Sequence, residues 1–173
     1  MYGIIFDLDQ TLLDTSIAEQ YRRARNWRKV YDLIPAFKPY ENLIEIVGDQ
    51  VDKGLSASIV TNSPESYCRK IVNYWAIPVS NMVCYHDTRR HKPEPEPFRL
   101  ALERMKVEKN CAISFGDKNE DIMASNSAGI DSVFCSWGAD ENSTSVNAKY
   151  SLDSPTQINN LMEQWVEEKN QIS

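Results

Sequence analysis

The sequence has no apolar run that would cross a membrane, since a spanning helix needs about 20 consecutive apolar residues. Its first residues form an apolar segment that ends in acids, without the basic region and long apolar run of a leader peptide. The four cysteines form no close CxxC pair, and each lies in or beside an apolar stretch, where a reduced cysteine packs as a small hydrophobe. These absences predict a soluble, cytoplasmic protein.

An excess of positive charge is also absent. The formal net charge of the 173 residues is -6, which argues against acidic membranes as partners and against nonspecific binding to nucleic acid. A local basic patch is still able to select an anionic substrate. With 173 residues, of which 42% are hydrophobic, the chain is long enough for one domain with a core, or for one domain plus a small appendage, whereas two full domains are not expected.

Apolar segments of strand length alternate with helical patterns, and this alternation predicts an α/β fold with a central parallel sheet. The predicted strands are residues 2–6, 57–61, 82–85, 111–115 and 132–135. Apolar stripes at helical spacing predict helices around residues 40–51, 67–75, 98–105 and 158–165. Residues 171–173 are expected to fray.

Two carboxylates, Asp7 and Asp9, follow the first predicted strand directly. They lie two positions apart, so both can point toward one pocket in an extended chain. Nearby carboxylates repel, and they are tolerated when a cation neutralises them, when one holds a proton, or when solvent reaches them. Mg2+ suits oxygen ligands, and a carboxylate can also attack phosphorus as a nucleophile. Taken alone, the segment is equally consistent with an Asp-rich turn.

Four polar segments occur in order at or just after predicted strand ends. They are Asp7-Leu8-Asp9-Gln10-Thr11, Thr61-Asn62-Ser63, Lys92-Pro93-Glu94-Pro95 and Gly116-Asp117-Lys118-Asn119-Glu120-Asp121. With these segments the chain resembles the haloacid dehalogenase-like (HAD) hydrolase superfamily, its phosphatase branch in particular, from Tyr2 to about Leu152. The stretch GDKNEDIMASNSAG at 116–129 is close to the fourth motif of that family over its whole length. The resemblance implies a three-layer Rossmann-like fold with a short helical cap insertion.

The resemblance also implies roles for three side chains. Asp7 is expected to be the nucleophile that takes the phosphoryl group, and Asp9 the general acid and then base. The dehalogenase branch typically lacks the second aspartate, so its presence favours phosphate chemistry. Lys92 is expected to hold the phosphorylated aspartate and to offset charge, although a lone lysine is usually a solvated surface residue.

Phosphate and metal ligands are implied in the same way. Thr61 and the backbone at Asn62 are expected to donate hydrogen bonds to phosphate oxygens beside a helix start. Asp117 is expected to complete a Mg2+ site with the Asp7 carboxylate and the Asp9 backbone carbonyl.

Supporting positions are expected at Thr11 and Asp121. Asp121 orients the metal shell or Lys92 in this interpretation, and its alternative is an ordinary acid at a helix amino end.

The interval between the first two motifs is short. We expect residues 1–14 and 39–173 to form the catalytic core, and residues 15–38 to form a minimal cap of one long helix or a helix with a turn. A minimal cap leaves the pocket open, which suits a bulky phosphorylated substrate or closure by another subunit. It also makes a sugar phosphate mutase less favoured.

The insertion is basic, whereas the chain as a whole is acidic. Five basic residues without one acid occur between Arg22 and Lys29. They are able to steer anionic substrates, and solvated basic residues on an exposed face are an equally good interpretation. Arg89 and Arg90, just before Lys92, are candidate substrate contacts.

The leading interpretation is a Mg2+-dependent phosphatase that hydrolyses phosphate monoesters through an aspartyl phosphate. A phosphotransferase shares all the same residues, and it differs only in whether water reaches the intermediate. A noncatalytic phosphate-binding protein on the same fold would be expected to lose Asp7, Asp9 or Lys92, and all three are present. The sequence leaves the substrate and the oligomeric state open.

Overall fold

Four consecutive buried residues form the central strand, β1 (Gly3–Phe6), of the computed structural model, which describes residues 1–172. Continuous apolar strands are typical of a parallel sheet that is covered on both faces. β1 pairs in parallel with β4 (Ser56–Val60) on one side and with β6 (Ala112–Gly116) on the other. The first motif therefore leaves the middle of the sheet.

The sheet has six parallel strands in the order β5-β4-β1-β6-β7-β8. The outer strands are β5 (Asn81–Val83), β7 (Asp131–Cys135) and β8 (Tyr150–Leu152). The predicted parallel α/β sheet is confirmed, except that β8 was not predicted. β8 has three residues at the sheet edge, of which only Leu152 is buried, so it lacks the apolar run that marks the inner strands.

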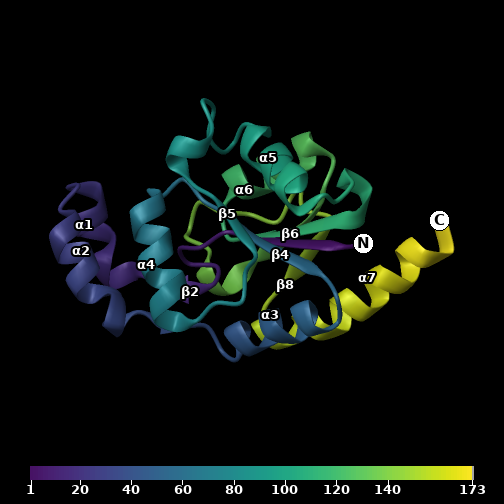
Figure 1. The fold of residues 1–173 in the computed structure, drawn as a ribbon, viewed down its shortest axis with the longest axis horizontal. Coiled ribbons are helices and arrows are strands. Elements are labelled where there is room, and N and C mark those ends of the chain that lie inside the picture. Colours follow the sequence, from purple (N-terminus) through teal and green to yellow (C-terminus); the bar gives the residue numbers. More distant parts are fainter. Residues whose placement is uncertain (173) are drawn as a thin grey trace.

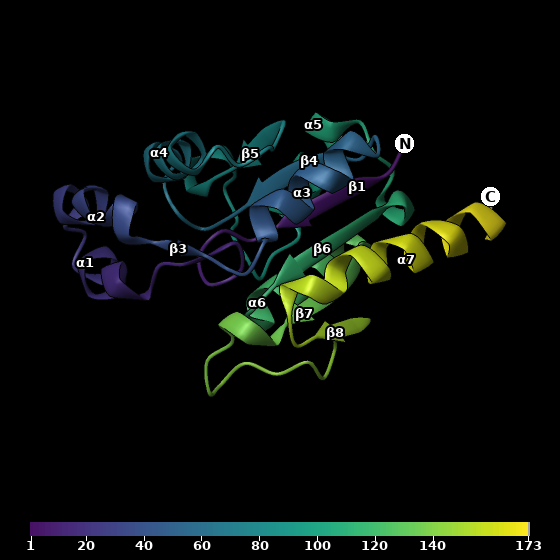
Figure 2. The ribbon, with the colours of Figure 1, turned by 90° about the horizontal axis from the view of Figure 1, so that it is seen from below.

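Helices cover both faces of the sheet (Figures 1 and 2), which confirms the three-layer Rossmann-like fold. α3 (Leu43–Asp52) and α7 (Ile158–Ile172) lie on one face, and α5 (Glu96–Met105) and α6 (Asn119–Ala128) lie on the other. Within residues 1–172, no helix has the length and apolar character needed to cross a membrane. The prediction of a frayed end is wrong at 171–172, which are helical, and Ser173 lies outside the described residues.

Alternate residues of β1 point to opposite layers. Ile4 and Phe6 belong to one buried cluster, together with residues of α3 and α7, whereas Ile5 belongs to the other, with residues of α5 and α6. Phe6 stacks on Phe115 of β6, with ring centroids 4.9 Å apart. The strand end that precedes Asp7 is thus fixed by packing on both sides.

The insertion at 15–38 contains two short helices, α1 (Glu19–Arg23) and α2 (Trp27–Leu33), and two single 3-10 turns, Ser16–Ala18 and Ile34–Ala36. Arg25 adopts a left-handed backbone conformation with φ 54, and the Asn26 side chain accepts a hydrogen bond from the Lys29 N–H. These two features end one helix and begin the next. A single long helix is therefore excluded, and the alternative expectation of a helix with a turn is closer to the structure.

A two-stranded antiparallel ribbon joins the insertion to the rest of the chain. It consists of β2 (Leu13–Asp14) and β3 (Lys38–Pro39), with Leu13 opposite Pro39 and Asp14 opposite Lys38. The insertion lies beside α4 (Glu65–Trp75) at one end of the molecule (Figure 1). The ribbon lies next to the expected ends of the insertion, and the division into core and cap stays a prediction.

Candidate active site

Asp7, Thr61 and Asp117 each directly follow a strand, at the carboxyl end of β1, β4 and β6 respectively. Those strands are neighbours in a parallel sheet, so the three residues meet at one edge. Ligands in open α/β sheets bind outside this edge. The Asp7 N–H continues the ladder by donating to the Phe115 carbonyl at 2.9 Å, which holds the start of the first motif in line with β6.

Lys92 is the centre of the buried charge. Its Nζ lies 2.6 Å from Oδ1 of Asp7 and 2.6 Å from Oδ1 of Asp121, and it donates to the Val60 carbonyl at 3.1 Å. All three ammonium donors therefore have acceptors. Burial by itself would lower the pKa of Lys92, but the carboxylates of Asp121 and Asp7 raise it above its ordinary value. Lys92 is thus a permanently charged bridge between two acids.

Asn62 fixes the backbone of Lys92. Its Nδ2 donates to the Lys92 carbonyl and its Oδ1 accepts from the Lys92 N–H, both at 3.2 Å. The neighbouring Thr61 is buried, and its Oγ1 accepts a hydrogen bond from the Ser63 N–H at 3.1 Å, which leaves the hydroxyl proton to donate elsewhere. The second and third motifs are therefore physically joined.

Three carboxylates, those of Asp7, Asp117 and Asp121, have oxygens within 4.8 Å of one another. Burial is the main cause that raises the pKa of Asp7 from 3.8 to about 7, with Lys92 acting in the opposite direction. Burial and then the charge of Asp7 raise the pKa of Asp117 from 3.8 to about 8. The site therefore favours a proton or a cation among these acids.

Asp117 has one satisfied and one unsatisfied oxygen. Oδ1 accepts a hydrogen bond from the Thr11 hydroxyl at 2.8 Å, whereas the buried Oδ2 has no hydrogen-bond partner among the described residues. A buried polar atom without a partner is costly unless a ligand satisfies it. Oδ2 of Asp117 thus has the chemistry of an open metal ligand, next to the Asp7 carboxylate.

Gly116 allows Asp121 to reach this cluster. A Cβ atom at position 116 would lie 2.3 Å from Cβ of Asp121, far inside van der Waals contact. Asp121 also accepts a hydrogen bond from the Lys118 N–H at 3.0 Å, as an acid at the start of α6 does. One oxygen of Asp121 thus faces Lys92 and the other serves the helix start, and its role in orienting Lys92 or a metal shell stays a prediction.

Asp9 points into a different set of partners. Its Oδ1 lies 2.5 Å from Arg22 and accepts hydrogen bonds from the Tyr67 hydroxyl at 2.6 Å and the Thr15 hydroxyl at 2.8 Å. Its Oδ2 accepts from the Ser63 hydroxyl at 2.9 Å. Thr15 and Arg22 belong to the insertion, whereas Ser63 and Tyr67 belong to the rest of the chain. Asp9 therefore links the two parts.

The hydrogen-bond and ion-pair partners of Asp9 were not predicted from the sequence. Arg22 had a visible signal, because it lies in a basic segment of an acidic chain, but that signal did not single it out from its neighbours. Tyr67 had none, since its place in the apolar stripe of α4 predicted only a core residue. Its ring is indeed fully buried, and burial followed by the charge of Asp9 raises the pKa of its hydroxyl above the ordinary value.

The turn that carries Asp9 is supported by the segment after β7. The Trp137 Nε1–H donates to the Thr11 carbonyl at 3.1 Å, and a Cβ atom on Gly138 would lie only 1.5 Å from the Gln10 carbonyl oxygen. Gln10 itself has a left-handed backbone conformation with φ 65. Gly138 is therefore required by the close approach of two backbone segments.

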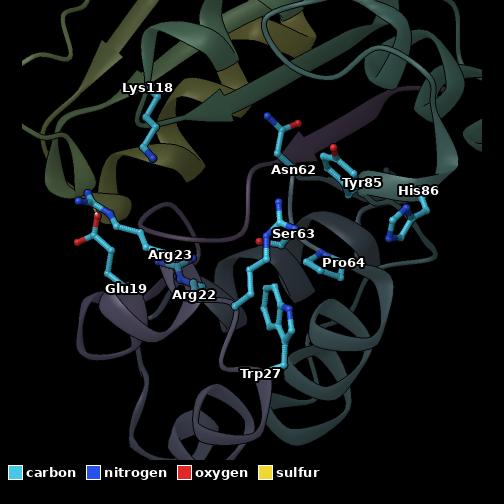
Figure 3. A pocket seen from close by; sticks show the side chains of 11 residues that line it. Glu19, Arg22, Arg23, Trp27, Asn62, Ser63, Pro64, Tyr85, His86 and Lys118 are labelled. Atoms are coloured by element: carbon cyan, nitrogen blue, oxygen red, sulfur yellow. Dashed lines mark hydrogen bonds and ion pairs between the residues drawn. The ribbon is translucent and has the colours of Figure 1, made fainter.

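A cleft of about 650 Å³ opens between the insertion and the strand ends (Figure 3). Its lining residues are Glu19, Arg22, Arg23, Arg25, Trp27, Asn62, Ser63, Pro64, Tyr85, His86 and Lys118. Arg89 and Arg90 are not among them. Both are exposed, the Arg89 N–H donates to Glu96, and Arg90 lies 4.0 Å from Glu94. Their contact with substrate stays a prediction, and the cleft instead receives arginines from the insertion.

The family model described as haloacid dehalogenase-like hydrolase matches residues 16–135 of this chain. The chain belongs to that family. The matched segment includes Thr61, Lys92, Asp117 and Asp121 and begins after Asp7 and Asp9, whose positions beside the matched residues come from the structure.

The matches to curated relatives extend over only part of this chain and over only part of each relative. The pyrophosphatase PpaX of Bacillus velezensis is 30% identical over 117 residues, which is 66% of this chain and 53% of the relative. The phosphoglycolate phosphatase of Rhodospirillum rubrum is 27% identical over 101 residues, 57% of this chain and 42% of the relative. The chain thus spans about half the length of these relatives.

Solved structures share the fold of this family member. The HAD phosphatase from Thermococcus onnurineus superimposes with a TM-score of 0.77 at 18% identity, covering 94% of this chain and 98% of the other. CbbY from Rhodobacter sphaeroides in complex with phosphate gives a TM-score of 0.77 at 15% identity, covering 91% and 96%. At such identities the likeness concerns the fold alone.

Proposed function

We propose that this protein is a Mg2+-dependent phosphatase that hydrolyses phosphate monoesters through a phosphorylated Asp7. The observation that carries the proposal is the contact of Lys92 with both Asp7 and Asp121 at 2.6 Å, beside a buried carboxylate oxygen of Asp117 that has no partner among the described residues. This arrangement combines a nucleophile, a fixed positive charge and an open oxygen ligand within one small volume. The pyrophosphatase and phosphoglycolate phosphatase names of the relatives support phosphate chemistry.

The acids fit Mg2+ by their donor type and by Oδ2 of Asp117, which is buried without a partner among the described residues. A hard cation prefers carboxylate and carbonyl oxygens, and the Asp7 and Asp117 carboxylates, with the backbone carbonyl of Asp9, would hold it. When bound, Mg2+ neutralises charge between the substrate phosphate and the acids. Thr11 keeps the Asp117 carboxylate in place through the 2.8 Å hydrogen bond.

In the proposed first step, a carboxylate oxygen of Asp7 bonds to phosphorus as the ester P–O bond breaks, and Asp9 gives a proton to the leaving oxygen. In the second, Asp9 takes a proton from water, the water oxygen bonds to phosphorus, and the bond from Asp7 to phosphorus breaks. Lys92 stabilises the charge that develops on the transferring group, and Thr61 and the Asn62 backbone hold its oxygens.

Asp9 must exchange a partner before it transfers a proton. Four donors surround its carboxylate in the structure, so both oxygens act as acceptors. Carrying a proton to a leaving group requires that one donor be released. Arg22, on the five-residue helix α1, is the charged one.

We infer further that residues 15–38 act as a minimal cap over a core of residues 1–14 and 39–173. The ribbon of β2 and β3 and the cleft between the two parts support this division. A small cap over an open cleft suits a bulky phosphorylated substrate. It leaves room for a leaving group that extends past the insertion.

The proposal is tested with Asp7→Asn and an aryl phosphate. Asp7→Asn should abolish release of inorganic phosphate with an unchanged far-UV circular dichroism spectrum, because an amide is a far weaker nucleophile than a carboxylate. Asp49→Asn, at an exposed position on α3, is the matched control and should keep full turnover. Chelation should stop the wild-type reaction and Mg2+ should restore it.

Retained turnover in Asp7→Asn, or turnover in excess chelator, contradicts the proposal. Loss of the aryl phosphate without a matching amount of inorganic phosphate would instead show transfer to another acceptor. Binding of phosphate without turnover would indicate the noncatalytic alternative.

A further inference from the structure

The cleft has two chemically different ends, with Asn62, a proposed phosphate ligand, and its neighbour Ser63 between them (Figure 3). One end holds Arg23 and Lys118 together with Glu19, and the other holds Trp27, Pro64, Tyr85 and His86. A ligand that places a phosphate at the strand ends and fills this cleft would meet positive charge on one side and aromatic rings on the other.

Positive charge exceeds negative charge in the cleft. Its lining includes four basic side chains, which are Arg22, Arg23, Arg25 and Lys118, and one acidic side chain, Glu19. Arg22 is bound to Asp9, and Arg23 is paired with Glu19. Arg25 makes no ion pair within residues 1–172, so its charge is available to a ligand. A chain of net charge -6 has therefore gathered cations beside its phosphate site.

Rings at the opposite end are held in place by other rings. Trp27 packs against Tyr67, with centroids 5.8 Å apart, and against Tyr31 at 6.3 Å. Tyr85 is 42% exposed and stacks on His91 at 3.9 Å. Rings that are fixed before binding lose little conformational entropy when a planar group stacks on them.

We propose that the cleft selects a nucleotide with two phosphate groups, and this inference rests on the proposed phosphatase function. One phosphate, a monoester, lies at Asp7, the second is bound by the basic end around Arg23 and Lys118, and the base packs at the aromatic end near Trp27. Hydrolysis consumes one water and breaks one P–O bond, releasing inorganic phosphate and the nucleotide that keeps the other phosphate. The ligand is either a free nucleoside bisphosphate or the phosphorylated end of a short strand.

A small acid such as phosphoglycolate does not account for this cleft. Its two-carbon leaving group fills little of about 650 Å³ and has no ring for the aromatic end. A long nucleic acid is also disfavoured, because the net charge of -6 repels a polyanion outside the cleft.

The test compares kcat/KM for phosphate release in Mg2+ from matched compounds. Adenosine 3′,5′-bisphosphate is set against adenosine 3′- and 5′-monophosphate, which lack the second phosphate, and against fructose 1,6-bisphosphate, which has two phosphates but no aromatic base. A 5′-phosphorylated dinucleotide represents the end of a strand, and p-nitrophenyl phosphate reports the basal reaction. We expect the adenosine bisphosphate or the dinucleotide to exceed each comparator by about tenfold or more.

Arg23→Gln tests the basic end, and Arg28→Gln is its matched control. Arg28 belongs to the same basic segment, is exposed, and does not line the cleft. Arg23→Gln should bring the bisphosphate down to within about threefold of the better monophosphate. Arg28→Gln should keep the wild-type preference. Thermal unfolding of both variants shows whether the fold is kept, and Lys118→Gln provides a second probe of the same end.

The inference is overturned if neither the adenosine bisphosphate nor the dinucleotide has a higher kcat/KM than the monophosphates, or if a preference survives both Arg23→Gln and Lys118→Gln. A preference for fructose 1,6-bisphosphate over both nucleotide ligands also overturns it. If p-nitrophenyl phosphate is turned over while no nucleotide is preferred, only this inference fails. If nothing is turned over, the proposed function fails as well. Whichever of the free bisphosphate and the dinucleotide has the higher kcat/KM identifies the source of the ligand.

Discussion

Asp7 and Asp9 differ in which part of the molecule holds them. Asp7 contacts Lys92, which the core alone positions through Asn62, Val60 and Asp121. Asp9, two residues later, is held jointly by the core and by the insertion. Under the proposed function, the nucleophile is thus held by the core alone, whereas the proton donor is coupled to the part of the chain that lines the cleft. The proposal therefore predicts that rate and specificity are separable by mutation.

Lys92→Met should have the largest effect. It removes the fixed charge beside Asp7 and should lower kcat by about 100- to 1000-fold or more. It also leaves buried acids without their cation, so unfolding in urea with chelator present should show a loss of about 3 kcal/mol. Lys53→Met, at an exposed ion pair with Glu163, is the control and should change neither quantity appreciably. A variant with wild-type kcat would remove Lys92 from the site.

Asp9→Asn should distinguish the role of Asp9 from that of Asp7, because its effect should depend on how readily the leaving group departs without a proton. An alkyl phosphate needs a proton on its leaving oxygen, so its hydrolysis should fall by about 100-fold or more. An activated aryl phosphate such as p-nitrophenyl phosphate needs the proton less, so its first step should fall by a smaller factor. The rate constant for p-nitrophenol release in single-turnover kinetics, with enzyme in excess, measures that step. Equal losses for both esters would contradict the role of Asp9 as the acid.

Gly138→Ala should damage the turn on which Asp9 lies. The added Cβ would meet the Gln10 carbonyl oxygen at 1.5 Å, so the turn must shift. We expect a loss of about 1 to 3 kcal/mol in unfolding free energy and a loss of activity. Gly48→Ala is the control, because its Cβ would meet only Pro78 at 3.8 Å within a helix. Wild-type activity in Gly138→Ala would show that this support is dispensable.

Protons and Mg2+ should compete for the carboxylates of Asp7 and Asp117. Of the four predictions in this section, this one has the smallest expected effect. Burial raises the pKa of Asp7 to about 7 and of Asp117 to about 8, so folding favours their neutral forms. In chelator, that stabilisation is complete below pH 3.8 and is lost as the pH rises through 7 and 8. The Tm increase caused by Mg2+ should therefore grow from pH 6 to pH 9. A constant increase across this range would exclude the linkage.

Much of the site was predictable because its residues directly follow strands. The apolar runs before Asp7, Thr61 and Asp117 predicted parallel strands. The structure shows that these strands are neighbours, so their carboxyl ends meet at one edge. The resemblance then added Lys92, which the structure places between Asp7 and Asp121. Roles for these residues remain proposals that the variants above test.

Contacts between distant side chains were less predictable. Tyr67 has the spacing of a core residue and nonetheless donates to Asp9. Arg22 is one of five basic residues in its segment, and only the path of α1 selects it. Gly138 has no special local sequence pattern. A side chain is excluded there because the Gln10 backbone, which is far away in the chain, approaches it closely.

The sequence by itself determined the parallel α/β class of the sheet and the residues that follow its inner strands, because apolar runs and their alternation with helical patterns are local properties of the chain. Only the tertiary structure decided that Asp9 faces Arg22, that Gly138 lies against Gln10, and that the cleft has a basic and an aromatic end. Those features depend on where a short insertion, joined by two-residue strands, comes to lie against the core. Such placement is set by packing between segments far apart in the chain, which no local pattern records.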